Sequence, residues 1–126
     1  FSVEKAFSEF AAIELGMCES VEKFREKAMG LGFGSVGEED SWEEIFFKIL
    51  LEKVEPALSR VGPVFLLDYP ARMAALAKLK EANPDWAERV ELYIGGMELA
   101  NGFTELNDPR EQRQRFNEER KRRLMA

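Results

Sequence analysis

The sequence predicts an α+β fold, in which a helical first half packs on antiparallel strands of the second half. Serine caps and amphipathic stripes recur through residues 1–60, a short apolar run at 63–70 lies between prolines, and an alternating segment at 87–94 ends in a glycine pair. We therefore expect residues 1–60 to form a helical segment and residues 61–126 to hold strands and a last helix.

Each helix of the first half is predicted by a serine N-cap that precedes apolar residues at helical spacing. Glu44 follows Ser41 by three residues, which completes a capping box. Pro56 predicts a kink or a restart near the end of the third helix. The three caps and their stripes are Ser2 with Val3, Phe7 and Phe10; Ser20 with Val21, Phe24, Ala28 and Leu31; and Ser41 with Trp42, Ile45, Phe46, Ile49, Leu50 and Val54.

The second half is predicted to begin with a buried strand at 63–70. Residues 73–80 are apolar and favour either a helix or an irregular segment. Asn83-Pro84-Asp85 then favours a turn or a helix start.

A hairpin is predicted from residue 87 onward. Residues 87–94 alternate, with Val90, Leu92 and Ile94 on one side and Arg89, Glu91 and Tyr93 on the other. Gly95-Gly96 supplies the positive φ angles of a tight turn. A second strand at 97–106, interrupted at Asn101-Gly102, follows, and Asp108-Pro109 begins the last helix.

Composition excludes several classes of function. The 126 residues contain no histidine and one cysteine, so we expect no zinc site, no imidazole base and no internal disulfide. Cys18 lies among acidic residues, which disfavours a nucleophilic thiolate. The net charge of −6 disfavours general binding to nucleic acid or anionic membranes. Without a membrane-length apolar stretch, we expect a cytoplasmic protein with no membrane partner.

Two carboxylates, Glu98 and Glu105, are the first candidate site residues. On a straight strand their odd spacing places them on opposite faces, roughly 23 Å apart. A bulge or bend at Asn101-Gly102 would change both relations and allow the pair to hold metal-bound ATP. The alternative is two solvated glutamates on a half-exposed strand.

The step Asn101-Gly102-Phe103 also has two interpretations. In the first, the step forms a simple turn, since Asn and Gly tolerate left-handed backbone. Alternatively Gly102 admits a ligand, Asn101 hydrogen-bonds it and Phe103 walls the pocket. The basic segment 110–123 has two interpretations as well. In one it contacts a nucleotide, an RNA or an acidic protein; in the other it forms a solvated face with ion pairs such as Glu111 and Arg115.

The block from Phe46 to Arg123 resembles the elongation factor P–lysine ligase family, whose members are relatives of class II lysyl-tRNA synthetases. The matching stretches run across most of the second half of the chain. They are Leu51 to Pro56, Asp68-Tyr69-Pro70-Ala71, Glu88 to Gly96, Glu98 to Glu105 and Arg110 to Phe116.

The resemblance implies a part of a class II catalytic domain that uses ATP and Mg²⁺. It places Glu98 and Leu99 at the ATP site, Glu98 and Glu105 at the metal, and Asn101, Phe103 and Glu105 at the lysine site. It assigns no catalytic acid or base to this chain. Such enzymes form lysyl-adenylate from lysine or β-lysine and pass the lysyl group to elongation factor P.

Two alternatives stay open. At Thr104 and Asn107 the sequence is more similar to true lysyl-tRNA synthetases, which charge tRNA-Lys with lysine. The other alternative is a non-catalytic interaction module. The arginine motif upstream, the glycine-rich motif downstream and the dimer-forming motif of class II enzymes are all missing from these 126 residues. We therefore expect an internal fragment, inactive alone, that associates as a homo-oligomer through unpaired strand edges.

Overall fold

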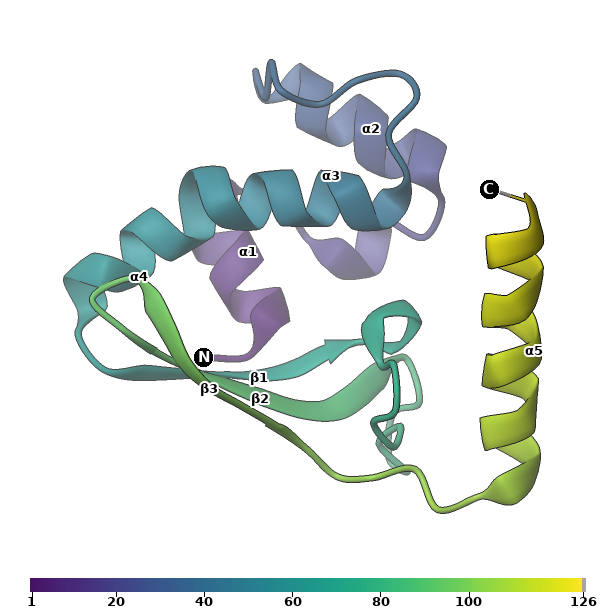
Figure 1. Ribbon diagram of the computed structural model, residues 1–126. Coiled ribbons are helices and arrows are strands. Elements are labelled where there is room, and N and C mark those ends of the chain that lie inside the picture. Colours follow the sequence, from purple (N-terminus) through teal and green to yellow (C-terminus); the bar gives the residue numbers. More distant parts are fainter. Residues whose placement is uncertain (126) are drawn as a thin grey trace.

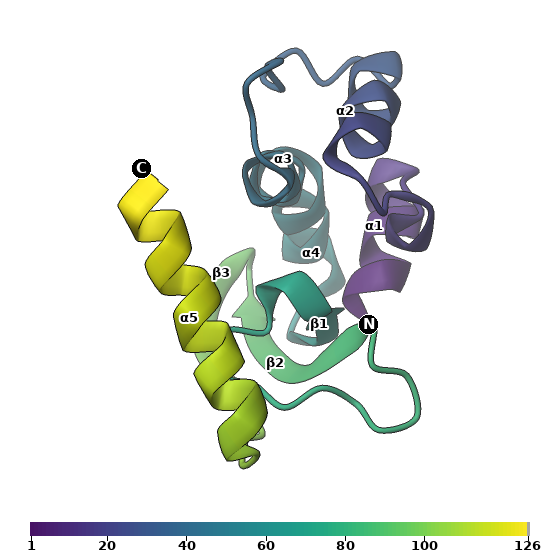
Figure 2. The same ribbon diagram turned by 90° about the vertical axis from the view of Figure 1, so that its right-hand side faces the viewer.

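The computed structural model describes residues 1–125 and shows helices covering one face of a small antiparallel sheet (Figure 1). This arrangement confirms the predicted α+β class. The last helix stands at one side of the molecule, apart from the other helices (Figures 1 and 2). The main elements are α1 (Val3–Ala11), α2 (Val21–Gly30), α3 (Trp42–Ile49), α4 (Glu55–Val61), β1 (Val64–Pro70), β2 (Trp86–Ile94), β3 (Met97–Phe103) and α5 (Pro109–Met125).

The first three helices begin at the predicted serines. The side chains of Ser2, Ser20 and Ser41 each accept a hydrogen bond from the backbone N–H three residues later. The Ser41 N–H donates a hydrogen bond of 2.7 Å to the Glu44 side chain, which completes the capping box. These caps satisfy backbone donors that a helix leaves free, so they fix where each helix starts.

The third helix changes its winding before Pro56. A π-helical turn, η2 (Leu50–Val54), connects α3 to α4, and Pro56 lies in the first turn of α4. Proline has no N–H to donate within the helix, and a local π turn is one way to accommodate that loss. The expected irregularity at Pro56 is therefore a change of winding within a continuous helical run.

One hydrophobic core joins the helical half to the sheet. Phe46 is fully buried and stacks on Phe7 at 4.7 Å and on Trp42 at 5.7 Å between ring centroids. The same core includes Leu66 of β1 and Tyr93 of β2. All six predicted apolar residues of the third helix are buried, whereas Leu31, predicted on the apolar stripe of α2, is 43% exposed because the chain leaves the helix at Gly30.

The sheet has the order β1-β2-β3, with both pairs antiparallel. Residues 1 and 2 lie along β1, where the Leu67 N–H donates to the Phe1 carbonyl at 2.9 Å. Residues 74–85 form no regular strand or helix, and a short 3₁₀ turn, η3 (Ala71–Met73), precedes them. Of the two predictions for 73–80, the irregular segment is confirmed.

Gly95 and Gly96 form the two-residue turn between β2 and β3. Their φ angles are +62° and +79°, as a type I′ turn requires, and Ile94 pairs with Met97. A Cβ at Gly96 would lie 3.1 Å from the Ser59 Cβ and 3.3 Å from the Glu55 carbonyl oxygen of α4. The turn therefore packs directly against α4, and Gly96 permits that approach.

The irregularity of β3 lies at Leu99, which corrects the predicted interruption at Asn101-Gly102. Leu92 pairs with Ala100 and Tyr93 with Glu98, so Leu99 is an extra residue in the ladder. Asn101 and Gly102 remain regularly paired with β2. Register is a property of the pairing partner, which local sequence does not report.

Helix α5 begins at Pro109 as predicted. The Asp108 side chain accepts a hydrogen bond of 2.9 Å from the Arg110 N–H. Arg115 ties the helix to the irregular segment by donating to the carbonyls of Ala75 and Ala77 at 2.8 and 2.6 Å. Within residues 1–125, no helix has the length and apolar character needed to cross a membrane.

Candidate functional site

The centre of the candidate site is Glu91 of β2, the only charged residue that is buried among residues 1–125. Its Oε1 accepts a hydrogen bond of 2.8 Å from Arg89 Nη2, and its Oε2 accepts one of 2.8 Å from the Tyr93 hydroxyl. A buried carboxylate requires such partners, because removing it from water is otherwise costly. Both oxygens of Glu91 are therefore held in fixed positions.

Arg89 is itself anchored from two sides. Its Nη1 donates to the Met73 carbonyl at 2.9 Å, and its guanidinium lies 4.5 Å from the centroid of the Tyr69 ring. The buried Tyr69 hydroxyl has no hydrogen-bond partner among residues 1–125, and burial raises its pKa. The turn η3 and strand β1 thus hold the cation that balances Glu91.

Two further carboxylates lie around Tyr93. Glu98 of β3 is its cross-strand partner, and the Glu55 side chain approaches from α4. Burial, and then the negative charge of Glu91, raise the pKa of Glu98. Burial likewise raises the pKa of Glu55, Tyr93 lowers it, and the negative charges of Glu91 and Glu98 raise it further. The site thus concentrates negative charge, which a cation would neutralise.

The bulge at Leu99 places three predicted residues on one face. Glu98 pairs with Tyr93, Asn101 with Glu91 and Phe103 with Arg89. Cross-strand partners point to the same side of a sheet, so these side chains share the side of Glu91. The extra residue Leu99 places Glu98 on the same face as Asn101 and Phe103, which a straight strand would not do.

Leu99 and Glu105 lie apart from this group. Leu99 is the bulge residue and is 55% exposed. Glu105 lies beyond the end of β3, exposed, in an isolated bridge with Ala77. Since β3 stays extended from Met97 to Phe103, Glu98 and Glu105 are roughly 20 Å apart along the strand. The structure does not bring these two carboxylates together.

The donor set fits one hard divalent cation that also binds a ligand. Glu91 and Glu98 offer carboxylate oxygens on adjacent strands, and Mg²⁺ characteristically takes one or two carboxylates together with phosphate oxygens. Across residues 1–125, no group of three or more Asp, Glu, Cys or His side chains could enclose a metal by itself. Such a cation would therefore need ligands from outside this site.

Sequence reasoning missed Glu91 because the usual rule selects the wrong face of β2. Val90, Leu92 and Ile94 form the apolar side of the alternation, yet Ile94 is 42% exposed and the core lies on the side of Glu91 and Tyr93. The available signal was the pair Arg89 and Glu91 at spacing two, which places a cation beside an anion on one face.

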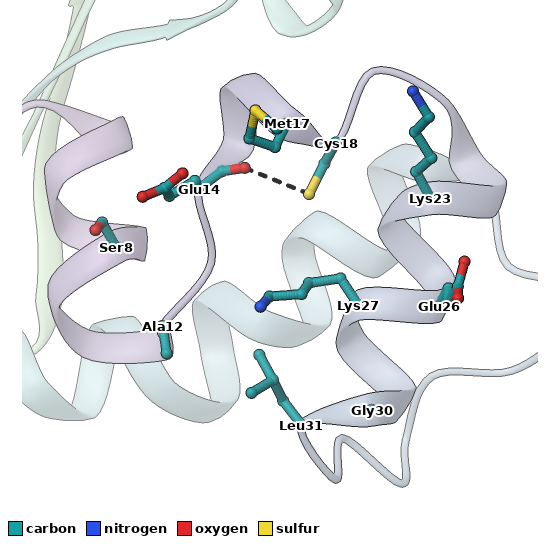
Figure 3. A pocket seen from close by; sticks show the side chains of 10 residues that line it. All are labelled: Ser8, Ala12, Glu14, Met17, Cys18, Lys23, Glu26, Lys27, Gly30 and Leu31. Carbon is teal, nitrogen blue, oxygen red and sulfur yellow. Dashed lines mark hydrogen bonds between the residues drawn. The ribbon is translucent and has the colours of Figure 1, made fainter.

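A separate hollow of about 900 Å³ lies between α1 and α2 (Figure 3). It contains none of the predicted site residues. The Cys18 thiol lies at its wall, 3.5 Å from the Glu14 carbonyl, and burial and then Glu4 raise the pKa of that thiol. A raised pKa lowers the thiolate fraction, in agreement with the expectation that Cys18 is not a nucleophile.

With this geometry in place, comparison with known proteins defines the class. The family described as class II tRNA synthetases (D, K and N) matches residues 9–125, and the chain belongs to this family.

Within the family, its relatives act on lysine according to their names. The chain is 42% identical over 113 residues to a lysine–tRNA ligase of Carboxydothermus hydrogenoformans, covering 89% of this chain and 22% of the relative. It is 40% identical over 114 residues to an elongation factor P–(R)-β-lysine ligase of Vibrio cholerae, covering 87% and 35%. A ligase of the same name from Erwinia tasmaniensis is 36% identical over 126 residues, covering 99% and 38%. The chain thus spans between about a fifth and two fifths of these relatives.

Proposed function

We propose that the protein containing this chain activates lysine or β-lysine with ATP and transfers the lysyl group to elongation factor P. The observation that carries the proposal is the bulge at Leu99, which sets Glu98, Asn101 and Phe103 on the face of Glu91. Similarity to ligases that act on lysine supports the choice of amino acid.

In this proposal, Glu91 and Glu98 hold Mg²⁺ together with phosphate oxygens of ATP, and Leu99 lies at the ATP site. The ion would neutralise phosphate charge as pyrophosphate leaves. Arg89 and Tyr93 fix the Glu91 carboxylate, so that it does not have to reorganise when the charged ligand binds.

The lysine site follows β3 away from the carboxylates. Asn101 hydrogen-bonds the amino acid and Phe103 walls the pocket. At the far end, Glu105 pairs with the lysine ammonium. We give Glu105 this role because it lies too far from Glu98 along the strand for the two carboxylates to bind the same ion. The two ends of the segment 98–105 would thus bind the two substrates of the activation step.

The alternative acceptor is tRNA-Lys. Asn107-Asp108-Pro109 favours it, and so does the 42% identity to a lysine–tRNA ligase. Activation of lysine is common to both proposals, and only the second step differs.

We also propose a homo-oligomer in the cytoplasm. The outer edge of β3 has no strand partner within residues 1–125, and Met97 and Leu99 on it are 65% and 55% exposed. Such edges favour association. Light scattering that showed a monomer at high concentration would contradict this part of the proposal.

The test of the activation step is lysine-dependent exchange of pyrophosphate into ATP, measured on the complete reading frame that contains this chain. Glu91→Gln and Glu98→Gln should each lower the exchange rate by about 100-fold or more, because each removes a carboxylate ligand. Glu88→Gln is the matched control, since Glu88 also lies on β2 but, within residues 1–125, forms no ion pair with the residues of the site. Full exchange by Glu98→Gln would refute the proposal.

A further inference from the structure

Helix α5 is strongly basic and has all of its acidic residues on one side. Seven basic and three acidic residues give Pro109–Met125 a net charge of +4. Since the whole chain has a net charge of −6, the remaining residues have a net charge of −10. No residue of α5 is buried, and its apolar residues form no stripe. The helix therefore contributes little to the core, and its cations need another explanation.

The three acids of α5 all lie toward the body of the molecule. Glu111, Glu118 and Glu119 line a hollow of about 980 Å³ between α5, the turn η3 and α3. Glu111 pairs with Arg115 and Glu119 with Arg123. Arg110, Arg115 and Arg122 line the same hollow, so the charges on this inner side of α5 balance.

The opposite side of α5 is cationic. Arg113, Asn117, Arg120 and Lys121 follow the spacing i, i+4, i+7 and i+8 of a single helical face, are exposed, and do not line that hollow. We call this set the outer basic face. Among residues 1–125, Arg113, Arg120 and Lys121 form no ion pair. In both views α5 stands at the edge of the molecule, with the other elements on one side of it (Figures 1 and 2).

We propose that the outer basic face docks an acidic patch of the acceptor protein, an inference that rests on the proposed function. Arginine forks match carboxylates in a bidentate geometry. The face spans only about 12 Å and its four members are all polar, while the aromatic Phe116 beside them lines the inner hollow, which suits a transient, electrostatically steered complex. A released product requires that kind of complex.

An RNA fits the same face less well. Its phosphates repeat along the whole strand, so a bound RNA would extend past α5 over a body of charge −10. A folded protein can present its acidic patch to α5 alone. The charge separation within the chain therefore favours a protein acceptor.

The test uses elongation factor P and tRNA-Lys as two fluorescent probes, with the complete reading frame and a pair of charge-matched variants. Arg113→Glu/Arg120→Glu reverses the outer basic face. Lys23→Glu/Lys53→Glu makes the same change in net charge at two exposed residues of α2 and η2. Fluorescence anisotropy measures affinity without requiring catalysis.

We expect Arg113→Glu/Arg120→Glu to weaken elongation factor P binding by about 10-fold or more at low salt, with a smaller difference at high salt. Lys23→Glu/Lys53→Glu should change it by less than about twofold, and both variants should keep lysine-dependent pyrophosphate exchange. Equal weakening by both variants, unchanged affinity, or binding of tRNA-Lys alone would overturn the inference. Absent pyrophosphate exchange in the unaltered protein would instead refute the proposed function, while anisotropy would still test the docking face.

Discussion

The helical half buries apolar side chains, whereas the β2–β3 hairpin also buries a carboxylate. In the helical half, buried side chains such as Phe46 are apolar and the charged residues lie outside. In the hairpin, Glu91 is buried while Ile94, Met97 and Leu99 are 42%, 65% and 55% exposed. Natural proteins tolerate such inversions at functional sites. The comparison indicates that the helices supply most of the apolar core, and it agrees with the ligand site that we propose in the hairpin.

The largest expected effect is on the helical side. Phe46→Ala should lower the free energy of unfolding by about 3–5 kcal/mol, because it removes a fully buried ring that stacks on Phe7 and Trp42. Urea denaturation followed by circular dichroism measures it. The exposed neighbour Phe47 is the control, and Phe47→Ala should cost less than about 1 kcal/mol. Equal losses would break the comparison.

Arg89→Met tests whether charge burial in the hairpin also carries stability. Glu91 would lose its cation while staying buried, so the free energy of unfolding should fall by about 3 kcal/mol. In the double variant Arg89→Met/Glu91→Gln the buried charge is gone, and most of this loss should be recovered. Additive losses in urea denaturation would show that the pair is not coupled.

The glycine turn separates backbone strain from packing on α4. Gly95→Ala and Gly96→Ala each force alanine to a positive φ, which costs about 1–2 kcal/mol. Gly96→Ala should cost about 1 kcal/mol more, because only its Cβ would press on Ser59 and the Glu55 carbonyl. Thermal unfolding of the two variants gives the difference directly. A Gly95→Ala protein that is the less stable of the two would contradict the packing of the turn on α4.

The smallest effects are in pH dependence, and they have opposite signs in the two regions. The pKa of Asp40 lies below its usual value because its carboxylate accepts a hydrogen bond from Lys48 and, with a smaller effect, one from the Gly37 N–H. The stability that this carboxylate contributes is therefore present at neutral pH and is lost in acid. The raised pKa of Glu98 in the hairpin means that its charge opposes folding at neutral pH and that protonation relieves this as pH falls.

Matched amide variants measure these two signs. Asp40→Asn should be less stable than the unaltered chain at neutral pH, with a difference that shrinks in acid. Glu98→Gln should be slightly more stable at neutral pH, and its advantage should disappear as pH falls through the raised pKa of Glu98. Urea midpoints across the acid range measure both, and the same sign for both would remove this part of the comparison.

Local rules predicted most of the fold. Serine caps, the capping box at Ser41 and the paired glycines at 95 and 96 each act within a few residues, and the structure has each where the sequence placed it. The change of winding before Pro56 also follows from one residue's missing donor.

The arrangement of the site depends on pairings that no local rule contains. The extra residue Leu99 appears only when β3 is aligned with β2, and that alignment decides which side Asn101 and Phe103 share. Burial of Glu91 depends on Met73 and Tyr69, which lie 18 and 22 residues away and hold its arginine. The family resemblance predicted a site in the segment 98–105, which stays a prediction, and the structure led us to propose Glu91 and to separate Glu98 from Glu105.

The most direct measurement of the central claim is acceptor labelling by the complete reading frame. Labelled lysine, ATP, magnesium, elongation factor P and tRNA-Lys are combined in one reaction, and the Glu98→Gln protein is run in parallel. Label on elongation factor P that disappears in Glu98→Gln is the result that we predict. Label on tRNA-Lys would contradict the choice of acceptor, and undiminished labelling by Glu98→Gln would contradict the assignment of the site itself.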